Sequence, residues 1–175
     1  FKMVVLLAAL EKGVITPDFS IFCNGSMELG SAEFHCWNKH GHGTMDARKA
    51  ITQSCDVYFY EIAKRTGIDY IAAMARRFGL GAPLGIDLPG EGSGLVPTPK
   101  WKRAAMKTVW QKGETVITGI GQGYLLVTPL QLAIMTAILV NGGMSITPHL
   151  TRKITGKGRI EKELKHKQGE SLNLS

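Results

Sequence analysis

Residues 1–13 read FKMVVLLAALEKG, and this stretch does most to decide the fold. Apolar side chains would lie on nearly every side of a helix over 1–12, which is typical of a helix in the middle of a domain. Gly13 is expected to end it, because glycine readily adopts the left-handed conformation that closes helices. The eight apolar residues at 3–10 are too few to cross about 30 Å of hydrocarbon. We therefore expect a buried helix and no membrane span.

The composition is that of one globular domain of 175 residues, with 44% hydrophobic and 20% charged residues. These values exclude a disordered, collagen-like or disulfide-dense chain. Of the net charge of +7, residues 151–170 carry +4, from seven Lys or Arg and three Glu. That stretch has no aromatic residue, whereas nucleic-acid-binding faces combine basic and aromatic side chains. We therefore predict a solvated basic polar loop or hairpin at 151–170, and no nucleic acid as partner.

Caps and glycines predict a mostly helical chain whose strands are few and late. Asp46 is a candidate N-cap for a helix over 47–53, and Asp69 for a helix that stops at Gly79. Thr-Pro pairs at 98–99 and 128–129 predict two further helix starts. The other expected elements are helices at 57–65 and 130–140, strand-like pieces at 19–22, 33–37 and 145–154, a Gly/Pro-rich loop at 80–97 and a glycine turn at 119–123.

Three polar residues are candidates for chemistry. Ser54 and Asp56 stand two residues apart in a turn between helices and can point into one cleft, although helix capping is the plainer interpretation. Lys2 lies in an apolar helix, where desolvation disfavours the charged ammonium and so favours a role as general base. The alternative interpretation is a lysine that is simply exposed at a frayed helix end. The glycine turn at 119–123 fits close backbone packing better than phosphate binding, because it lacks the P-loop pattern.

The three cysteines form a pattern with one histidine. Cys23, Cys36, His42 and Cys55 are spaced C-x12-C-x5-H-x12-C, and three thiolates with one imidazole complete a tetrahedral zinc shell. His35 and His40 are nearby alternatives, and the glycines on both sides of His42 let the chain bend around an ion. A Cys23–Cys36 disulfide with Cys55 buried, or three unrelated buried thiols, are the competing interpretations.

In order and spacing, these features resemble the transpeptidase domain of class B penicillin-binding proteins of the elongation type. Phe1-Lys2 resembles the end of the family's S-x-x-K motif, and Ser54-Cys55-Asp56 resembles its second motif, S-x-N or S-x-D. Further family-like segments are FHCW (34–37), GHG (41–43), GIDLPGE (85–91), PTPKWK (97–102), GIGQGY (119–124) and TPLQLA (128–133). The resemblance implies an α+β fold, mostly the helical subdomain of a penicillin-binding-protein or serine β-lactamase-like transpeptidase, with part of the antiparallel sheet missing.

The resemblance also implies a reaction. A serine attacks the D-Ala-D-Ala end of a peptidoglycan stem peptide, an acyl-enzyme forms, and an amine of a neighbouring stem completes the cross-link. Lys2 would be the base for the nucleophile, Ser54 would pass the proton to the leaving amine, and Asp56 would hold Lys2 or the substrate amide. β-Lactams would acylate the same serine. No cofactor is required for this chemistry, so a zinc ion at the cysteines would be structural.

Two parts of the family pattern fall outside the chain. The nucleophile would lie two residues before Phe1, and the Lys-Thr/Ser-Gly motif is expected after Ser175, since KITG at 153–156 does not match it. Residues 1–175 would then be an interior piece of a transpeptidase domain, inactive as given. The family implies the periplasmic face of the bacterial inner membrane, an anchoring N-terminal helix outside this chain, and a membrane glycosyltransferase and elongation-complex proteins as partners.

Two other interpretations stay open. One is a β-lactam sensor or serine β-lactamase relative with the same fold, although such proteins generally lack the run from GIDLPGE to TPLQLA. The other is a small zinc-binding basic module. That interpretation rests on the Cys/His spacing and on the net positive charge of the chain. Within the main interpretation, Asp56 in place of Asn leaves open how a proton is shared with Lys2.

Overall fold

The computed structural model describes residues 1–156, 159–163 and 168–174. Contacts divide the chain into two compact units. Unit 1 comprises Phe1–Ala75 and Val96–Leu125, and unit 2 comprises Arg76–Leu95 and Leu126–Ser175. Among the described residues, no helix has the length and apolar character needed to span a membrane.

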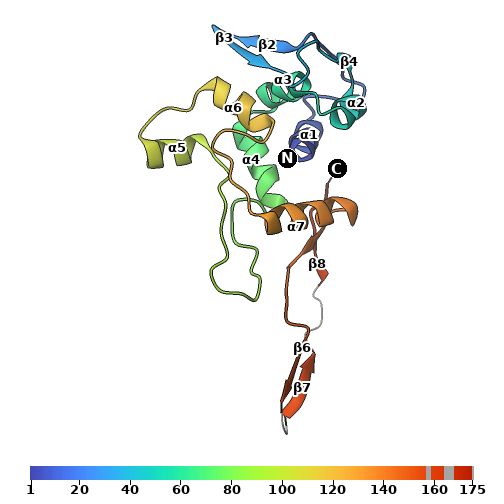
Figure 1. Ribbon diagram of the computed structural model, residues 1–175, viewed down its shortest axis with the longest axis vertical. Helices are drawn as coiled ribbons and strands as arrows, with labels where there is room; N and C mark the ends of the chain where they lie inside the picture. Colours follow the sequence, from blue (N-terminus) through green and yellow to red (C-terminus); the bar gives the residue numbers. More distant parts are fainter. Residues whose placement is uncertain (157–158, 164–167, 175) are drawn as a thin grey trace. The chain divides into compact units, whose positions relative to one another are not determined.

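Unit 1 combines helices with two antiparallel strand pairs (Figure 1). Its helices are α1 (Lys2–Glu11), α2 (Ala47–Thr52), α3 (Asp56–Thr66), α4 (Ile68–Arg77, which ends in unit 2), α5 (Pro99–Met106) and α6 (Lys112–Gly119). Strand β1 (Ile21–Cys23) pairs with β4 (Gly43–Met45), and β2 (Ser26–Leu29) pairs with β3 (Ala32–His35). In register, Cys23 lies opposite Gly43 and Ser26 lies opposite His35.

Helix α3 forms the core of unit 1. Eight of its eleven residues are buried, and Tyr58, Phe59 and Ile62 expose no surface at all. Helix α1 contacts α3 and buries Val4, Val5, Ala8 and Ala9, while its remaining apolar side chains are partly exposed. The expectation that helix 1–12 is buried on nearly every side is therefore wrong, because α3 takes the central position and α1 packs on it with one face.

Helix α6 packs against α3 at a point that accepts only a glycine. A β-carbon added to Gly119 would overlap the Ala63 Cβ and lie 3.1 Å from the Phe59 carbonyl oxygen. Both neighbours belong to the rigid α3 helix, so the two helices would have to move apart. We expect Gly119→Ala to lower the free energy of unfolding of the full-length protein by about 1–3 kcal/mol, as measured by urea denaturation.

The same helix offers a matched control. A β-carbon added to Gly113 would lie 3.1 Å from the edge of the Phe34 ring, which can turn aside. Because alanine favours helix over glycine, Gly113→Ala should be neutral or stabilising. An unfolding midpoint for Gly119→Ala equal to that of Gly113→Ala would contradict the tight α3–α6 contact.

Unit 2 contains helix α7 and two strand pairs. Helix α7 spans Pro129–Val140; β5 (Met144–Ile146) pairs with β8 (Gln168–Ser171), and β6 (Lys153–Gly156) pairs with β7 (Arg159–Glu163). The fully buried Gln131 connects α7 to the long loop before it in sequence. Its Nε2 donates to the carbonyls of Ala82 at 2.8 Å and Ser93 at 2.9 Å, and its Oε1 accepts from the Thr128 N–H at 3.1 Å. These bonds fix loop 80–95 to the start of the helix.

Two carboxylates order the GIDLPGE segment within unit 2. Glu91 accepts hydrogen bonds from backbone N–H groups, the shortest from Leu84 at 2.6 Å, and this bond lowers its pKa. Asp87 accepts from the Thr151 side chain and from the N–H of Leu150, and these bonds hold its pKa below the usual range. The segment is therefore a folded loop that anchors the chain after β5.

The expectation of few and late strands is wrong, since four strands precede residue 46. Each is three or four residues long, too short for apolar–polar alternation to be recognised. The expected strand at 145–154 is also wrong: β5 ends at Ile146, and β6 begins only at Lys153. For the region 151–170, the structure describes 151–156, which end in β6, then β7 and the part of β8 up to residue 170; residues 157–158 and 164–167 lie outside the described residues.

The expected helix caps are mostly confirmed. Asp46, Thr98 and Thr128 each accept a backbone N–H at a helix N-terminus. Asp69 instead lies inside the first turn of α4, which begins at Ile68 directly after Gly67. Helix α6 was not expected, although Glu114, which accepts the Gln111 N–H at 2.6 Å, forms part of a capping box that marks its start.

Candidate active site and metal centre

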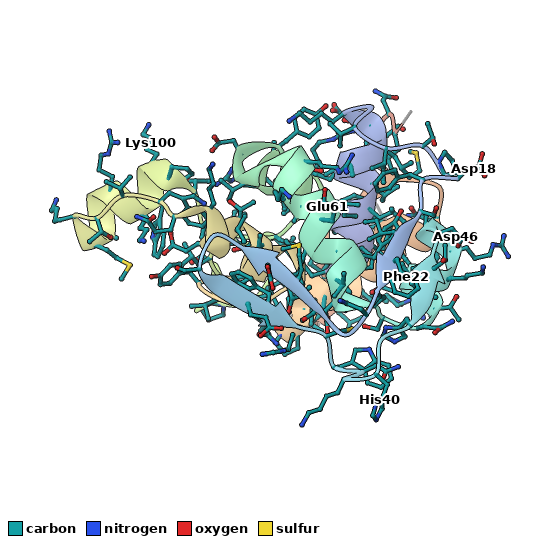
Figure 2. All side chains as sticks on the ribbon, turned by 90° about the horizontal axis from the view of Figure 1, so that it is seen from above. Asp18, Phe22, His40, Asp46, Glu61 and Lys100 are labelled. Atoms are coloured by element: carbon teal, nitrogen blue, oxygen red, sulfur yellow. The ribbon has the colours of Figure 1, made fainter. Side chains whose placement is uncertain are left out.

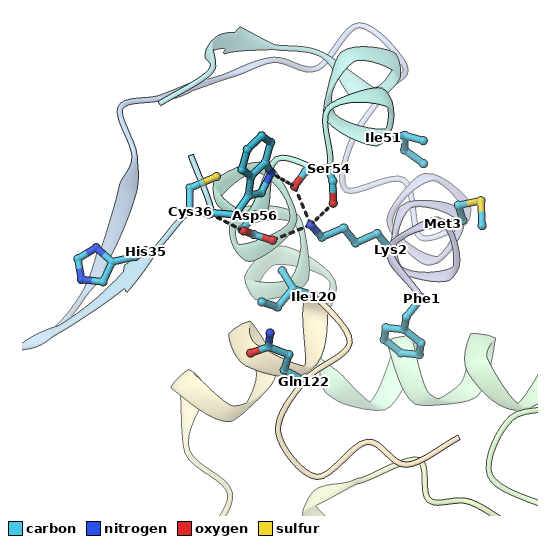
Figure 3. Close-up of a pocket in the computed structure, with 11 residues that line it drawn as sticks. Phe1, Lys2, Met3, His35, Cys36, Ile51, Ser54, Asp56, Ile120 and Gln122 are labelled. Carbon is cyan, nitrogen blue, oxygen red and sulfur yellow. Dashed lines mark hydrogen bonds and ion pairs between the residues drawn. The ribbon is translucent and has the colours of Figure 1, made fainter. Parts of the chain in front are cut away.

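An open pocket of about 830 Å3 lies in unit 1, where the start of α1, the turn before α3 and the segment after β3 meet. Its lining includes Lys2, Trp37, Ser54, Asp56 and Gln122. Figure 3 shows Lys2 reaching across the pocket towards Ser54 and Asp56. The pocket therefore contains all three residues that the sequence suggested for chemistry.

The Lys2 ammonium makes three close contacts. Its Nζ donates to Ser54 Oγ at 2.8 Å, to the Ser54 carbonyl at 2.8 Å and to Asp56 Oδ1 at 2.6 Å. The side chains of Lys2 and Asp56 are only 18% and 12% exposed, so water screens this ion pair less than a surface pair. A frayed, exposed Lys2 is thus not what the structure shows.

Both oxygens of Asp56 are engaged. Oδ1 holds Lys2, and Oδ2 accepts the backbone N–H of Trp37 at 2.9 Å. Asp56 is also the first residue of α3, where the helix dipole favours a negative charge. Of the two roles considered for Asp56, holding Lys2 is the one that this geometry supports.

Ser54 lies in an unusual backbone conformation in the turn between α2 and α3. Its φ of 53° is in the left-handed region, which is uncommon for a residue other than glycine. The turn directs its hydroxyl and its carbonyl together towards Lys2. Ser54 does not cap α3, whose N-cap is Cys55, so the plainer capping interpretation is wrong for Ser54.

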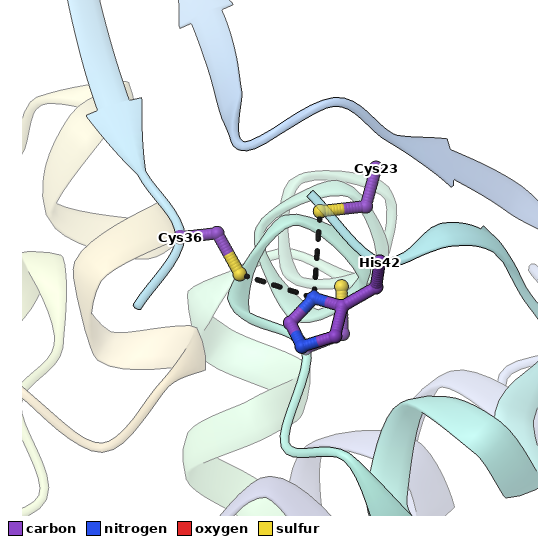
Figure 4. A group of neighbouring side chains, drawn as sticks. Cys23, Cys36 and His42 are labelled. Atoms are coloured by element: carbon purple, nitrogen blue, oxygen red, sulfur yellow. Dashed lines mark hydrogen bonds between the residues drawn. The ribbon is translucent and has the colours of Figure 1, made fainter. Parts of the chain in front are cut away.

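The four residues of the Cys/His pattern converge. The ligand atoms of Cys23, Cys36, His42 and Cys55 all lie within 4.8 Å of one another. His42 Nδ1 lies 3.6 Å from Cys23 Sγ and 3.5 Å from Cys36 Sγ (Figure 4). A tetrahedral zinc ion with Zn–S near 2.3 Å and Zn–N near 2.05 Å sets N···S separations of about 3.6 Å. The residues therefore fit zinc, and all three cysteines are buried free thiols.

Local structure explains how the cluster forms. Cys23 ends β1, Cys36 follows β3 and Cys55 precedes α3, so the strand pairs and the helix bring their thiols together. Gly41, at φ 75°, packs so closely on Cys23 that a β-carbon there would overlap the Cys23 carbonyl oxygen. This approach lets the His42 N–H donate to that carbonyl at 3.1 Å.

The two alternative histidines lie outside the cluster. His40 is exposed and points away from the body of unit 1 (Figure 2), and His35 lines the pocket instead. Burial raises the pKa of the Cys55 thiol to about 12. A bound divalent cation would reverse this effect, because it stabilises the thiolate.

Comparison with known proteins shows the family of this chain. The family model of the penicillin binding protein transpeptidase domain matches residues 1–173. The chain belongs to this family. The expected resemblance and the α+β transpeptidase fold are thereby confirmed.

The relatives include proteins named MrdA and PBP2. The chain is 48% identical, over 157 residues, to the peptidoglycan D,D-transpeptidase MrdA of Acinetobacter baumannii, covering 89% of this chain and 23% of the relative. It is 40% identical to Pseudomonas aeruginosa PBP2, solved in complex with WCK 5153, with a TM-score of 0.89 over 99% of this chain and 37% of that one. Helicobacter pylori PBP2, solved in complex with MreC, is 37% identical with a TM-score of 0.83, over 93% of this chain and 30% of that one. The chain thus spans less than half of these family members.

Trp37 was not identified from the sequence as a residue of the site. Trp37 is the last residue of the FHCW segment and of the expected strand-like piece at 33–37, and in the structure it donates to Asp56, Ser54 and Gln53. The available signal was its position directly after Cys36. Nothing in the sequence alone shows that this backbone meets the turn before α3.

Proposed function

We propose that the protein containing this chain is a peptidoglycan D,D-transpeptidase of the PBP2 type, which cross-links stem peptides through a serine acyl-enzyme during cell elongation. The supporting observation is one lysine, Lys2, that contacts both the Ser54 hydroxyl and the Asp56 carboxylate in an open pocket. Residues 1–175 then form part of the transpeptidase domain.

In the proposed reaction the nucleophile is a serine two residues before Phe1. Residues three apart on a helix are neighbours, so its hydroxyl would lie next to Lys2. The serine oxygen bonds to the penultimate D-Ala carbonyl carbon while Lys2 Nζ accepts the serine proton. The bond to the terminal D-Ala then breaks, and the proton passes from Lys2 through Ser54 Oγ, 2.8 Å away, to the leaving amine.

Asp56 supports this sequence by holding Lys2 and by offering a carboxylate that accepts a proton from it. Lys2 must be neutral when it acts as a base, and Asp56 Oδ1, at 2.6 Å, is the acidic group in contact with it. Lys2 and Asp56 therefore act as a pair in the proposed reaction. The second half-reaction uses the same groups in reverse order, with the amine of a neighbouring stem as the attacking group.

We further propose a structural zinc ion held by Cys23, Cys36, His42 and Cys55. Three soft thiolates and an imidazole suit zinc, and a closed set of four protein ligands is typical of structural sites. The ion would tie β1, β3 and the start of α3 together. It takes no part in the acyl transfer itself, which requires no cofactor.

The substrates are stem peptides that end in D-Ala-D-Ala, and β-lactams acylate the same serine. We propose a membrane glycosyltransferase and elongation-complex proteins as partners; the H. pylori PBP2–MreC complex supports the second class. The location is the periplasmic face of the bacterial inner membrane, with an anchoring helix outside this chain.

Labelling of the full-length protein with a fluorescent penicillin tests the proposal. We expect one stable covalent label for each chain, blocked by prior treatment with unlabelled benzylpenicillin, and no sustained hydrolysis of a chromogenic cephalosporin. Rapid turnover of the cephalosporin would instead indicate a serine β-lactamase. Absence of any label on folded protein would refute acyl transfer.

A further inference from the structure

Trp37 occupies a position that burial does not explain. The residue is 64% exposed, although aromatic rings usually lie where they bury apolar surface. Both of its N–H groups nevertheless donate to the turn before α3. The backbone N–H donates to Asp56 Oδ2 at 2.9 Å, and the indole N–H lies 3.1 Å from the carbonyls of both Gln53 and Ser54.

The Ser54 carbonyl needs such a donor. The left-handed backbone of Ser54 is disfavoured for a residue with a β-carbon, so it persists only where surrounding groups hold it. Two donors meet at this carbonyl, Lys2 Nζ at 2.8 Å and the Trp37 indole N–H at 3.1 Å. If the carbonyl rotated away, the Ser54 hydroxyl would turn with it and leave Lys2.

Trp37 is itself held by the structure around it. The Tyr60 hydroxyl donates to the His35 carbonyl at 3.0 Å, and the Cys36 N–H donates to the Gly25 carbonyl at 2.8 Å. The Trp37 ring also meets the His42 ring edge-on, with centroids 5.1 Å apart. The segment after β3 therefore presents its donors to Ser54 and Asp56 from a fixed position.

We propose that Trp37 is a positioning residue, whose indole N–H holds the Ser54 backbone so that the Ser54 hydroxyl stays on Lys2 Nζ. This inference rests on the proposed acyl transfer. It predicts a specific kinetic effect: loss of the indole N–H slows the acylation step, because the proton relay is misaligned, and leaves reversible binding of the β-lactam unchanged. One neutral hydrogen bond corresponds to a slowing of about two- to tenfold.

The test is the acylation of the full-length Trp37→Phe variant by a fluorescent penicillin, measured over a concentration series that separates the acylation rate from the dissociation constant. Phenylalanine keeps a ring against His42 and removes the indole N–H, but it is smaller than tryptophan. A second variant carries benzothienylalanine at position 37, which keeps the size of tryptophan without the N–H. It covers the case in which Trp37→Phe fails to fold.

Trp110→Phe is the matched control. The Trp110 indole N–H donates to Thr115 Oγ1 at 2.8 Å, so this variant also loses one indole hydrogen bond, but outside the pocket. We expect slower acylation only for the variants at position 37, with equal dissociation constants and melting temperatures near that of the unmodified protein.

Two results overturn the positioning role. Acylation of both position-37 variants at the unmodified rate shows that the N–H does not align Ser54. A larger dissociation constant, that is weaker binding of the β-lactam, with an unchanged acylation rate shows that Trp37 contacts the ligand instead. Failure of the proposed function is distinguishable from both, because the unmodified protein would then carry no stable label.

Discussion

Replacement of Lys2 by alanine is expected to slow acylation of the full-length protein by benzylpenicillin by about 10²- to 10⁴-fold, the usual contribution of a general base. The reason is that Lys2 Nζ contacts both Ser54 Oγ and Asp56 Oδ1 in the pocket. Alanine at this position removes the proposed proton acceptor. Rapid mixing followed by intact-protein mass measurement gives the rate directly.

Two variants separate the base from the charge and from the fold. Lys2→Arg keeps a positive charge beside Asp56 but cannot act as a base near neutral pH, so it should be as slow as Lys2→Ala. Lys12→Ala changes a lysine at the other end of the same helix, where Nζ donates to the Thr66 carbonyl at 2.6 Å, and should acylate at the normal rate. Acylation of Lys2→Ala within threefold of the unmodified protein would exclude Lys2 from the mechanism.

Removal of the proposed zinc ion is expected to destabilise unit 1 strongly. Loss of a ligand present at a thousand times its dissociation constant lowers the free energy of unfolding by about 4 kcal/mol. We expect about one zinc ion for each full-length chain purified under reducing conditions. His42→Ala should lose the metal and melt at a lower temperature, as measured by metal analysis and thermal unfolding.

His40→Ala is the matched control for the metal site, because His40 lies on the same loop but outside the cluster. It should retain the metal and the melting temperature. A folded, metal-free unmodified protein, or a Cys23–Cys36 disulfide found by mass spectrometry, would rule out the zinc site.

The polar residues of the site could be predicted from the sequence, because they come in recognisable patterns. Lys2, Ser54 and Asp56 were expected from motif order, and the structure brings them into contact across 52 and 54 positions. Cys23, Cys36, Cys55 and His42 were expected because three thiols and one imidazole make a complete ligand set. Residue type and order along the chain carry this information, independently of the backbone conformation between the residues.

The contacts made by backbone groups could not be predicted. The indole N–H of Trp37 donates to the backbone carbonyl of Ser54, 17 positions away, and the backbone N–H of Trp37 donates to the carboxylate of Asp56, 19 positions away. Every residue except proline has an N–H, so no letter marks the ones that meet. For the same reason, strands β1 to β4 were only partly foreseen, since pairing between three- or four-residue segments depends on the turns between them.

The central claim is that Lys2, Ser54 and Asp56 serve a serine nucleophile that stands two residues before Phe1. Peptide mapping of the full-length protein after reaction with benzylpenicillin tests it most directly. The penicilloyl group is expected on that serine, in the peptide that ends with Phe1 and Lys2. A penicilloyl group on Ser54, or on any other serine of residues 1–175, would contradict the account.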